Sequence, residues 1–322
     1  MNKEIVKWMR AVAFGFAAIL LISCDDSNEP TGKGNVQFEI TDSPSDDGNI
    51  TGVYVTVTDI KVDGRSIGGV TKATVNLKDY TEGATKVLAL ASQFDSKTYG
   101  SVTLVLDLNT DADGATPGCY VRTMDGKRYK LKNTVDGTTE VVASQNFEVA
   151  SNTTTKVVLD FDIRKAISYD ANDDVRYKFV GDDQLNSSLR VMVKEKGGAI
   201  KGILNNYLPA RSEKVVAYAY KKGTFSASTE TQPQGENQMY FMNAVASGEV
   251  KPGLNGRTFV VPFLEEGDYE LYFASYDETP SGRLAFQRIL VIGLNVNGTV
   301  GNRITVRSGG TVSVATVVSQ LP

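Results

Sequence analysis

Residue types that carry out most enzymatic chemistry are scarce in this chain of 322 residues. It contains no His and only two Cys, Cys24 and Cys119. Ser-His and Cys-His nucleophile pairs, His-based metal sites and imidazole pH switches all require a group that this sequence lacks. We therefore expect that the protein is not an enzyme.

One short segment nevertheless matches a catalytic pattern. Residues 64–68, Gly-Arg-Ser-Ile-Gly, have the spacing of a nucleophile elbow, in which Ser sits on a sharp turn between a strand and a helix. The turn signal Asp63-Gly64 lies at its start, and the chain has no His to act as the base. We interpret the segment as a hairpin turn.

A run of oxygen-bearing side chains occupies residues 107–114, Asp-Leu-Asn-Thr-Asp-Ala-Asp-Gly. Oxygen ligands at alternate positions, followed by Gly, are typical of the first half of a calcium-binding loop. The twelfth position of that pattern holds Tyr120 instead of Glu, which excludes an EF-hand. Two hypotheses stay open: a polar loop between strands without any cofactor, or a calcium site formed by Asp107, Asn109, Asp111 and Asp113.

Further acidic residues occur in groups, at Asp42, Asp46 and Asp47; at Asp160 and Asp162; at Asp170, Asp173 and Asp174; and at Asp182 and Asp183. A glycosidase needs two carboxylates that face each other across a cleft, and spacing along the chain does not establish this. Sugars could instead stack on Tyr218, Tyr220, Tyr272 and Tyr276. The alternative is that these tyrosines are strand residues divided between core and surface.

The first residues have the pattern of a secretory leader. Three basic residues precede the apolar run Ala11–Ile22, which is too short to span a membrane. Residues 21–24, Leu-Ile-Ser-Cys, resemble the bacterial lipobox. The resemblance implies a signal peptide over residues 1–23, with diacylglycerol on the sulfur of Cys24. Cys119 then has no disulfide partner, and we expect it to pack as a small apolar residue.

Residues 24–34 are polar and predict a flexible tether. Asp25 and Asp26 follow the expected lipid site and resemble the surface-export signal of Bacteroidetes-type lipoproteins. A solvated spacer is the alternative, and in other bacteria an Asp at this position indicates retention in the inner membrane. We expect an outer-membrane lipoprotein that faces the cell exterior.

The formal net charge is −4, which argues against nucleic acid as a partner. The most basic run, residues 126–132, fits the solvated face of a hairpin.

From residue 35 onward, apolar and polar residues alternate, which indicates strands with one buried face. Asp-Gly or Asn-Gly pairs, typical of tight hairpin turns, occur at 63–64, 125–126, 136–137 and 297–298. The pattern predicts an all-β protein, with two possible short helices at 84–94 and 164–169. We place a domain boundary within residues 194–198, giving β-sandwiches over 35–196 and 197–322, of the immunoglobulin or transthyretin-like kind.

Three segments of the first half resemble a known family: residues 34–44 (Gly-Asn-Val-Gln-Phe-Glu-Ile-Thr-Asp-Ser-Pro), 53–57 (Val-Tyr-Val-Thr-Val) and 158–163 (Val-Leu-Asp-Phe-Asp-Ile). They are similar to the family built on the domain of unknown function 4382. Its first strand ends in Thr-Asp-Ala-Pro and its last contains Leu-Asp-Phe-Asp; here Ser43 replaces the Ala. The resemblance covers about residues 34–196 and implies an envelope lipoprotein with no assigned activity.

The second half resembles the carboxypeptidase-regulatory or transthyretin-like sandwich, through residues 198–203, 215–220 and 263–271. In that fold a Gly turn, here at Gly267, brings a strand into the core, and a Tyr, here Tyr269, packs beneath it. The resemblance implies a spacer or accessory module, but a fold does not define a function.

The leading hypothesis is a non-catalytic, lipid-anchored envelope protein that displays two β-sandwiches for binding or assembly. Two alternatives are a fimbrial or adhesin-type subunit and a glycan-binding accessory of a polysaccharide uptake system. The expected partners are the membrane, through the lipid, and a surface protein or a glycan.

Overall fold

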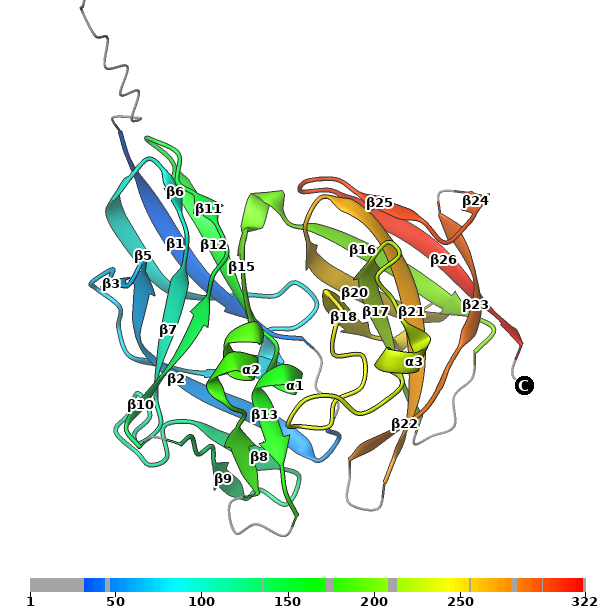
Figure 1. The fold of residues 1–322 in the computed structure, drawn as a ribbon, viewed down its shortest axis with the longest axis horizontal. Coiled ribbons are helices and arrows are strands. Elements are labelled where there is room, and N and C mark those ends of the chain that lie inside the picture. The colour runs from blue at the N-terminus through cyan, green and yellow to red at the C-terminus, as the bar shows by residue number, and fades with distance from the viewer. Residues whose placement is uncertain are drawn as a thin grey trace, which may run out of the picture. The chain divides into compact units, whose positions relative to one another are not determined.

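A computed structural model of the chain describes residues 32–43, 47–134, 136–171, 176–207, 213–254, 256–279, 283–296 and 298–320. The expected signal peptide, Cys24 and most of the tether lie outside these residues. From Gly32 onward the chain forms one compact unit (Figure 1). Within the described ranges, none of the helices has the length and apolar character needed to cross a membrane.

The first half of the unit is a sandwich of two main sheets. One has the strand order β15-β12-β1-β5, in which β1 and β12 run parallel. The other has the order β10-β7-β2-β8-β9, with β3 and β4 also paired to β2. The bounds are β1 (Lys33–Thr41), β2 (Ile50–Val62), β3 (Arg65–Ser66), β4 (Ala73–Asn76), β5 (Lys86–Asp95), β7 (Val102–Asp107), β8 (Tyr120–Thr123), β9 (Arg128–Lys130), β10 (Thr138–Ala143), β12 (Thr154–Phe161) and β15 (Leu189–Val193).

Short elements complete this half. Two small ribbons pair β6 (Thr98–Tyr99) with β11 (Phe147–Glu148) and β13 (Ile167–Tyr169) with β14 (Tyr177–Phe179). The helices are α1 (Ile163–Ala166) and α2 (Asp182–Ser187), with the 3-10 turns η1 (Leu77–Asp79) and η2 (Lys194–Lys196).

The second half is also a two-sheet sandwich (Figure 1). One sheet has the order β19-β20-β16-β26-β23-β24, and the other has the order β18-β17-β21-β22, with β25 also on β21. The bounds are β16 (Gly198–Asn205), β17 (Glu213–Lys221), α3 (Ala227–Glu230), β18 (Ala246–Glu249), β19 (Lys251–Gly253), β20 (Gly256–Leu264), β21 (Gly267–Glu278), β22 (Leu284–Ile289), β23 (Val291–Val296), β24 (Thr299–Val300), β25 (Ile304–Val306) and β26 (Thr311–Gln320).

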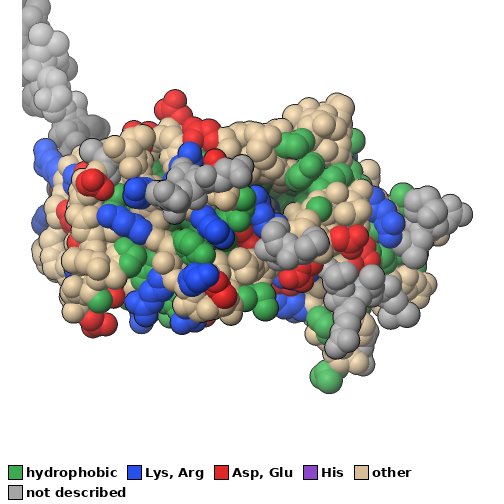
Figure 2. Space-filling view, turned by 90° about the horizontal axis from the view of Figure 1, so that it is seen from below, with side chains coloured by type: hydrophobic (Ala, Val, Ile, Leu, Met, Phe, Trp, Pro, Cys, Tyr) green, Lys and Arg blue, Asp and Glu red, His purple; other side chains and the backbone are tan. Residues whose placement is uncertain are grey.

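Alternating burial explains why these segments are strands. Val53, Val55 and Val57 on β2 are fully buried, as the sequence predicts. One core contains residues between Val36 and Val191, and another contains residues between Ile200 and Val318. The all-β sandwich class is confirmed. Figure 2 shows Lys and Arg interspersed with Asp and Glu on one face, so this face carries mixed charge.

The helix expected at residues 84–94 is wrong, because this segment forms the edge strand β5. Ala89 and Ala91 lie opposite Phe38 and Val36 of β1, where small side chains fit beside large ones. Strand pairing thus overrides the helical preference of Ala, Lys and Leu. The helix expected at 164–169 is correct only in part, because α1 ends at Ala166 and β13 follows.

The turn signals differ in their outcome. Asp63 and Gly64 both have positive φ, 47° and 76°, as the predicted tight turn between β2 and β3 requires. The basic run 126–132 includes β9 of the β8–β9 hairpin, as predicted. Asn297 lies outside the described residues.

Tyr269 is fully buried, and its hydroxyl donates to the carbonyl of Glu265 at 2.9 Å. The packing of Tyr269 beneath the Gly267 turn therefore agrees with the expectation. The transthyretin-like assignment of this half stays a prediction.

Candidate functional site

The two acidic motifs of the first half meet in space. The parallel pairing of β1 with β12 places Thr41 opposite Asp160, so both strands end at the same edge. Beyond that edge, Oδ1 of Asp42 accepts hydrogen bonds from the backbone N–H groups of Ser43 (2.7 Å) and Ile163 (3.1 Å). The first motif thus holds the start of α1.

Asp162 caps the same helix from its own strand. Its carboxylate accepts from the backbone N–H of Arg164 at 3.1 Å and from the Arg164 guanidinium at 3.0 and 2.7 Å. Both side chains are almost completely buried. Burial pushes the pKa of Asp162 upward, but the charges of Arg164 and Lys165 and the bonds from Arg164 bring it below its ordinary value. Asp162 is therefore an ionised partner of Arg164.

The pKa of Asp42 is shifted in the opposite direction from that of Asp162. Burial, with the nearby charges of Asp162 and Asp160, raises its pKa well above the ordinary value despite the two backbone bonds. Its Oδ2 is buried and has no hydrogen-bond partner among the described residues. The surroundings of Asp42 therefore favour its protonated, neutral form more than water does.

Arg164 extends this junction to the second sandwich. Its guanidinium lies 5.4 Å from the ring centre of Tyr218, and its carbonyl accepts from the side-chain amide of Asn237. The Asn237 oxygen accepts from Gln184 of α2 at 3.0 Å. We call Asp42, Asp160, Asp162, Arg164 and Asn237 the junction cluster. Its acids have structural partners, and they do not face each other across a cleft.

The tyrosines considered for sugar stacking lie mostly in a separate aromatic core. Tyr218, Tyr220 and Tyr276 are at most 2% exposed. The hydroxyls of Tyr218 and Tyr276 share a 2.7 Å hydrogen bond, and Tyr220 donates to the buried Glu230. Tyr272 is half-buried, and its ring is stacked on Phe225 with centres 3.6 Å apart. Three of the four rings are therefore closed to a ligand, and one face of the fourth is covered.

The loop considered as a calcium site is held by an ion pair and by hydrogen bonds from its own backbone. Asp107 pairs with Lys72 at 2.8 Å and accepts from the backbone N–H groups of Asn109 and Thr110. Burial raises the pKa of Asp107, but these bonds bring it to about 2.

The rest of the loop is held in a similar way. Asp111 accepts from the N–H groups of Asp113 and Ala115, and the Asn109 oxygen accepts from Lys130. Among the described residues, no cluster of three or more His, Cys, Asp or Glu is placed to hold a metal ion. Calcium binding stays a prediction that isothermal titration tests; no heat at millimolar Ca²⁺ would remove it.

Neither Ser66 nor Cys119 is activated as a nucleophile. Ser66 lies in the β2–β3 hairpin, and its hydroxyl donates to Asp59 at 2.8 Å. Cys119 is fully buried, and its thiol donates to the carbonyl of Asp107 at 3.2 Å. Burial raises the pKa of the thiol to about 12. Because the thiolate is the reactive form, Cys119 is inert.

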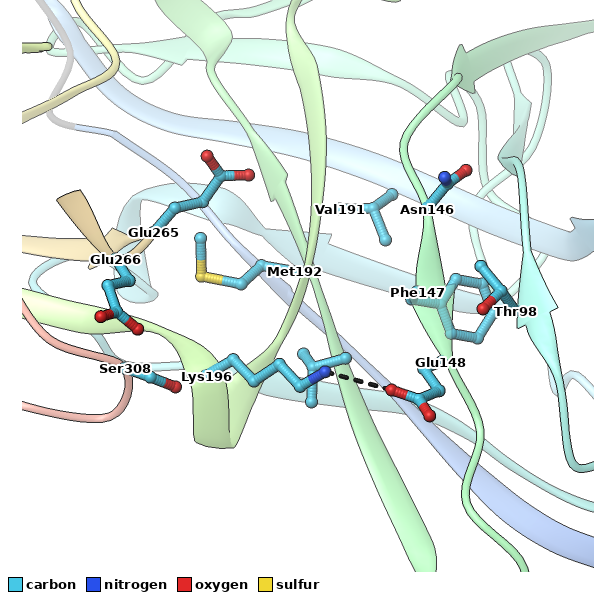
Figure 3. Close-up of a pocket in the computed structure, with 11 residues that line it drawn as sticks. Thr98, Asn146, Phe147, Glu148, Val191, Met192, Lys196, Glu265, Glu266 and Ser308 are labelled. Atoms are coloured by element: carbon cyan, nitrogen blue, oxygen red, sulfur yellow. Dashed lines mark hydrogen bonds and ion pairs between the residues drawn. The ribbon is translucent and has the colours of Figure 1, made fainter.

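An open groove of about 510 Å³ is a candidate binding site. β15 and η2 form its centre, β6 and β11 one side, and the turns before β21 and β26 the other. Its lining residues are Thr98, Asn146, Phe147, Glu148, Val191, Met192, Val193, Lys196, Glu265, Glu266 and Ser308. We call it the β15 groove (Figure 3).

The β15 groove combines an apolar floor with a polar rim. Phe147, Val191 and Met192 form the floor and are at most 9% exposed. Figure 3 shows Glu265 and Glu266 on one side of Met192, with Phe147 on the other side of β15. Thr98, Asn146, Ser308 and the charged side chains provide hydrogen-bonding groups at the rim.

The rim charges are only partly paired. Lys196 reaches across to Glu148 at 3.4 Å, and Glu265 lies 3.3 Å from Lys221. Glu266 has no ion-pair partner within the described part of the chain. Sequence reasoning missed this site because its residues come from distant segments and form no motif.

The sequence comparison agrees with the first resemblance. Residues 33–179 match the family model described as Domain of unknown function (DUF4382). The match covers less than half of the chain and ends with β14, before α2 and β15. It includes the motif segments that build the junction cluster. No curated protein matches the chain.

Solved structures give distant likenesses. The Bacillus anthracis TIE protein is 13% identical with a TM-score of 0.17; 88% of this chain is covered, but only 33% of that protein, about a third of its length. A candidate adhesin from Bacteroides ovatus is 14% identical, with 83% and 80% coverage and a TM-score of 0.16. The major pilin subunit BcpA of Bacillus cereus is 9% identical, with 88% and 70% coverage and a TM-score of 0.18.

Proposed function

We propose that the protein is a non-catalytic, lipid-anchored protein of the cell envelope that displays two β-sandwiches at the cell surface for binding or assembly. The observation that carries the proposal is that the side chains considered for chemistry are held in hydrogen bonds or are buried. Asp162 is bonded to Arg164, Ser66 to Asp59, and the Cys119 thiol is buried.

The expected tether supports a function close to the membrane. β1 begins at Lys33, only nine residues after Cys24. An extended chain spans at most about 3.6 Å per residue, so the start of β1 stays within about 30 Å of the lipid. A protein held this way meets partners that are themselves in the envelope or arrive at it.

Protease accessibility on intact cells tests the location. Proteinase K is added to cells, and an antibody to residues 198–322 follows the protein beside a periplasmic control. Loss of the signal while the control survives is the expected result. Protection until the outer membrane is opened would contradict surface display and leave a periplasmic scaffold.

Metabolic labelling tests the anchor separately. Radioactive palmitate is expected to label the wild-type protein and not Cys24→Ser, while Cys119→Ser keeps the label. Catalysis is tested on the purified chain without residues 1–24: turnover of any glycan or peptide would overturn a non-catalytic function.

Assembly into a fibre is a second candidate, and the edge strands favour it. β5 and β15 end the four-stranded sheet, and Val87 and Leu90 on β5 are 50% and 65% exposed. A free strand edge is a template for pairing with another chain. Size measurement in mild detergent extracts tests this, and a discrete monomer would count against it. A glycan-binding accessory instead requires thermal stabilisation by a polysaccharide.

A further inference from the structure

Two arginines lie side by side on the β8–β9 hairpin of the first sandwich. Arg122 of β8 is directly opposite Arg128 of β9 in the antiparallel pairing. Because Val121 is fully buried and side chains alternate along a strand, Arg122 points away from the core. Directly opposite residues share one face, with Cβ atoms about 5 Å apart, and like charges there destabilise a sheet. An anion between the two guanidinium groups would remove this repulsion.

Neither guanidinium group has a carboxylate partner within the described part of the chain. Arg122 and Arg128 form no ion pair there, and their side chains donate no hydrogen bond. The carboxylate in the hairpin turn, Asp125, lies 2.9 Å from Lys127 instead. Residues 172–175 lie outside the described residues. The described neighbours thus leave the two positive charges uncompensated.

Two stacked tyrosines restrain the arginines. The rings of Tyr54 on β2 and Tyr120 on β8 have centres 4.5 Å apart and are nearly parallel, at 12°. Arg122 lies 5.4 Å from the ring centre of Tyr54, and Arg128 lies 5.0 Å from that of Tyr120. These distances allow a cation–π attraction, which holds a guanidinium group while its N–H groups can still donate to a ligand. The two donor groups are therefore positioned in advance of binding.

Lysines continue the same face of the hairpin. Arg128, Lys130 and Lys132 alternate with two side chains that pack on the core, so they share one face at intervals of about 7 Å. Lys132 is bridged to Lys178, and both are exposed without a carboxylate partner among the described residues. Lys130 lies 3.9 Å from the exposed Asp136. We call Arg122, Arg128, Lys130, Lys132 and Lys178 the basic stripe.

The position and spacing of the basic stripe indicate its ligand. In Figure 1, β1 begins at the top of the first sandwich, where the tether joins, whereas β8 and β9 lie at the bottom. The stripe therefore faces away from the anchoring membrane, toward molecules that arrive from outside. Guanidinium groups bind carboxylate, sulfate and phosphate through paired hydrogen bonds. The negative net charge of the chain disfavours a densely charged polymer such as nucleic acid, so a sparsely charged acidic polymer fits better.

We propose, resting on the binding function proposed above, that the basic stripe binds an acidic polysaccharide. Arg122 and Arg128 together hold one carboxylate, sulfate or phosphate group of the polysaccharide. Tyr54 and Tyr120 are positioning residues, which keep the guanidinium groups in place. The lysines of the stripe attract the acidic groups that follow along the polysaccharide.

Oligosaccharides of defined size test the proposal directly. Fluorescein-labelled hexagalacturonate, which carries carboxylates, and a sulfated chondroitin hexasaccharide are titrated with the chain lacking residues 1–24, and anisotropy is measured. We expect saturable binding of at least one acidic probe that weakens with salt, and none for neutral maltohexaose. Equal binding of the neutral probe, or no binding of either acidic probe at millimolar protein, would overturn the proposal.

Substitutions of the arginines locate the site. Arg122→Gln and Arg128→Gln are each expected to weaken binding about fivefold to tenfold. Arg122→Lys keeps the charge but loses the paired geometry, so we expect a loss of about threefold. Arg65→Gln, an exposed arginine on β3 at the opposite end of β2, is the matched control and is expected to change nothing. An equal loss in Arg65→Gln would show a general charge effect and exclude the stripe as a site.

Thermal unfolding separates binding from a structural role. Because the two arginines repel each other, each Gln variant is expected to unfold within about 2 °C of the wild type. If a variant is destabilised further, Asp125→Asn decides, because it frees Lys127 and is expected to strengthen binding about twofold. Glu278→Gln, at the exposed end of β21, is its matched control and is expected to change nothing. Unchanged or weaker binding by Asp125→Asn would contradict the proposal.

Two further outcomes locate any failure. If single-stranded DNA binds and neither acidic oligosaccharide does, the stripe is a nucleic-acid site and this proposal is wrong. If a probe is cleaved during the titration, the non-catalytic function fails instead. Protease accessibility of the protein on cells is independent of both results.

Discussion

The junction cluster and the β15 groove both join the two sandwiches, yet they handle charge in opposite ways. In the junction, Asp162 and Arg164 are buried and bonded at 2.7 and 3.0 Å. In the groove, Lys196 and Glu148 are exposed and 3.4 Å apart, and Glu266 has no ion-pair partner among the described residues. Buried, fully bonded charges belong to the fold, whereas exposed, partly paired charges are available to a ligand.

The energetic reason is the cost of removing water. Breaking a buried ion pair leaves an uncompensated charge in a medium of low dielectric constant, which costs about 3–5 kcal/mol. An exposed pair contributes at most about 1 kcal/mol, because water solvates each partner when the pair separates. The comparison therefore makes quantitative predictions for substitutions in the two regions.

The largest effect is expected for Asp162→Ala. The variant leaves the Arg164 guanidinium buried without its carboxylate and removes the cap of α1. We expect the free energy of unfolding to fall by about 3–5 kcal/mol in urea denaturation. The exposed Asp113→Ala is the matched control, with a change within about 0.5 kcal/mol.

A double variant distinguishes charge from packing. Asp162→Leu with Arg164→Met removes both charges and keeps apolar volume, so most of the lost stability is expected to return. If Asp162→Ala alone leaves the free energy of unfolding unchanged, the ion pair does not stabilise the fold, and the contrast between the two regions fails.

The second prediction concerns the pH dependence of stability. Burial raises the pKa of Asp42 above that of the unfolded chain, so the native state keeps a proton that the unfolded state releases. Stability is then highest below about pH 4 as far as Asp42 is concerned, and it declines as the pH rises toward the native pKa. Few other groups titrate between pH 5 and 8, because the chain has no His.

Asp42→Asn tests this slope. The variant is neutral at every pH, so its unfolding free energy is expected to decline less between pH 5 and pH 8 than that of the wild type. Asp113→Asn serves as the control and is expected to keep the wild-type slope. A slope in Asp42→Asn equal to the wild type would show that Asp42 is ionised in the junction.

The sequence predicts the elements that form the junction, but it does not predict which of their residues meet. Alternation identified the strands, and the motifs at 41–43 and 158–163 were visible, because period-two patterns and short motifs are local. The meeting of Asp42 with Ile163 depends on the parallel pairing of β1 and β12, which residues 121 positions apart do not reveal. The composition of the Ala-rich β5 favours a helix for the same reason, since its partner β1 is distant in sequence.

The third prediction uses Asp107, whose exposure lies between the two regions. Burial opposes ionisation, but Lys72 and two backbone N–H groups bring the pKa to about 2, below the value of 3.8 for an unperturbed Asp. This stabilisation is present above about pH 4 and is lost as the pH falls toward 2. After allowance for solvent screening we expect about 1 kcal/mol.

Urea denaturation at pH 5 and pH 2.5 measures this contribution. Asp107→Asn is expected to lose about 1 kcal/mol at pH 5 and almost nothing further on acidification from this site. A variant that loses as much at pH 2.5 as at pH 5 would show that the loop is held by contacts other than the Asp107 charge.

The smallest effect is expected in the β15 groove. The double variant Glu265→Gln with Glu266→Gln removes two rim charges that are solvated and, in the case of Glu265, paired with Lys221 at 3.3 Å. We expect the free energy of unfolding to change by no more than about 0.5 kcal/mol, because exposed charges contribute little to folding. Thermal and urea denaturation of the double variant measure it beside Glu278→Gln.

A loss of more than about 1 kcal/mol would change the interpretation of the groove. The carboxylates would then hold the turn before β21 in place against β15, and weaker binding of a cationic ligand by the same variant would follow from a displaced turn. Unchanged stability with weakened binding of a cationic ligand is the result expected if the carboxylates attract that ligand themselves. The combination of the two measurements therefore separates a binding surface from a second structural junction.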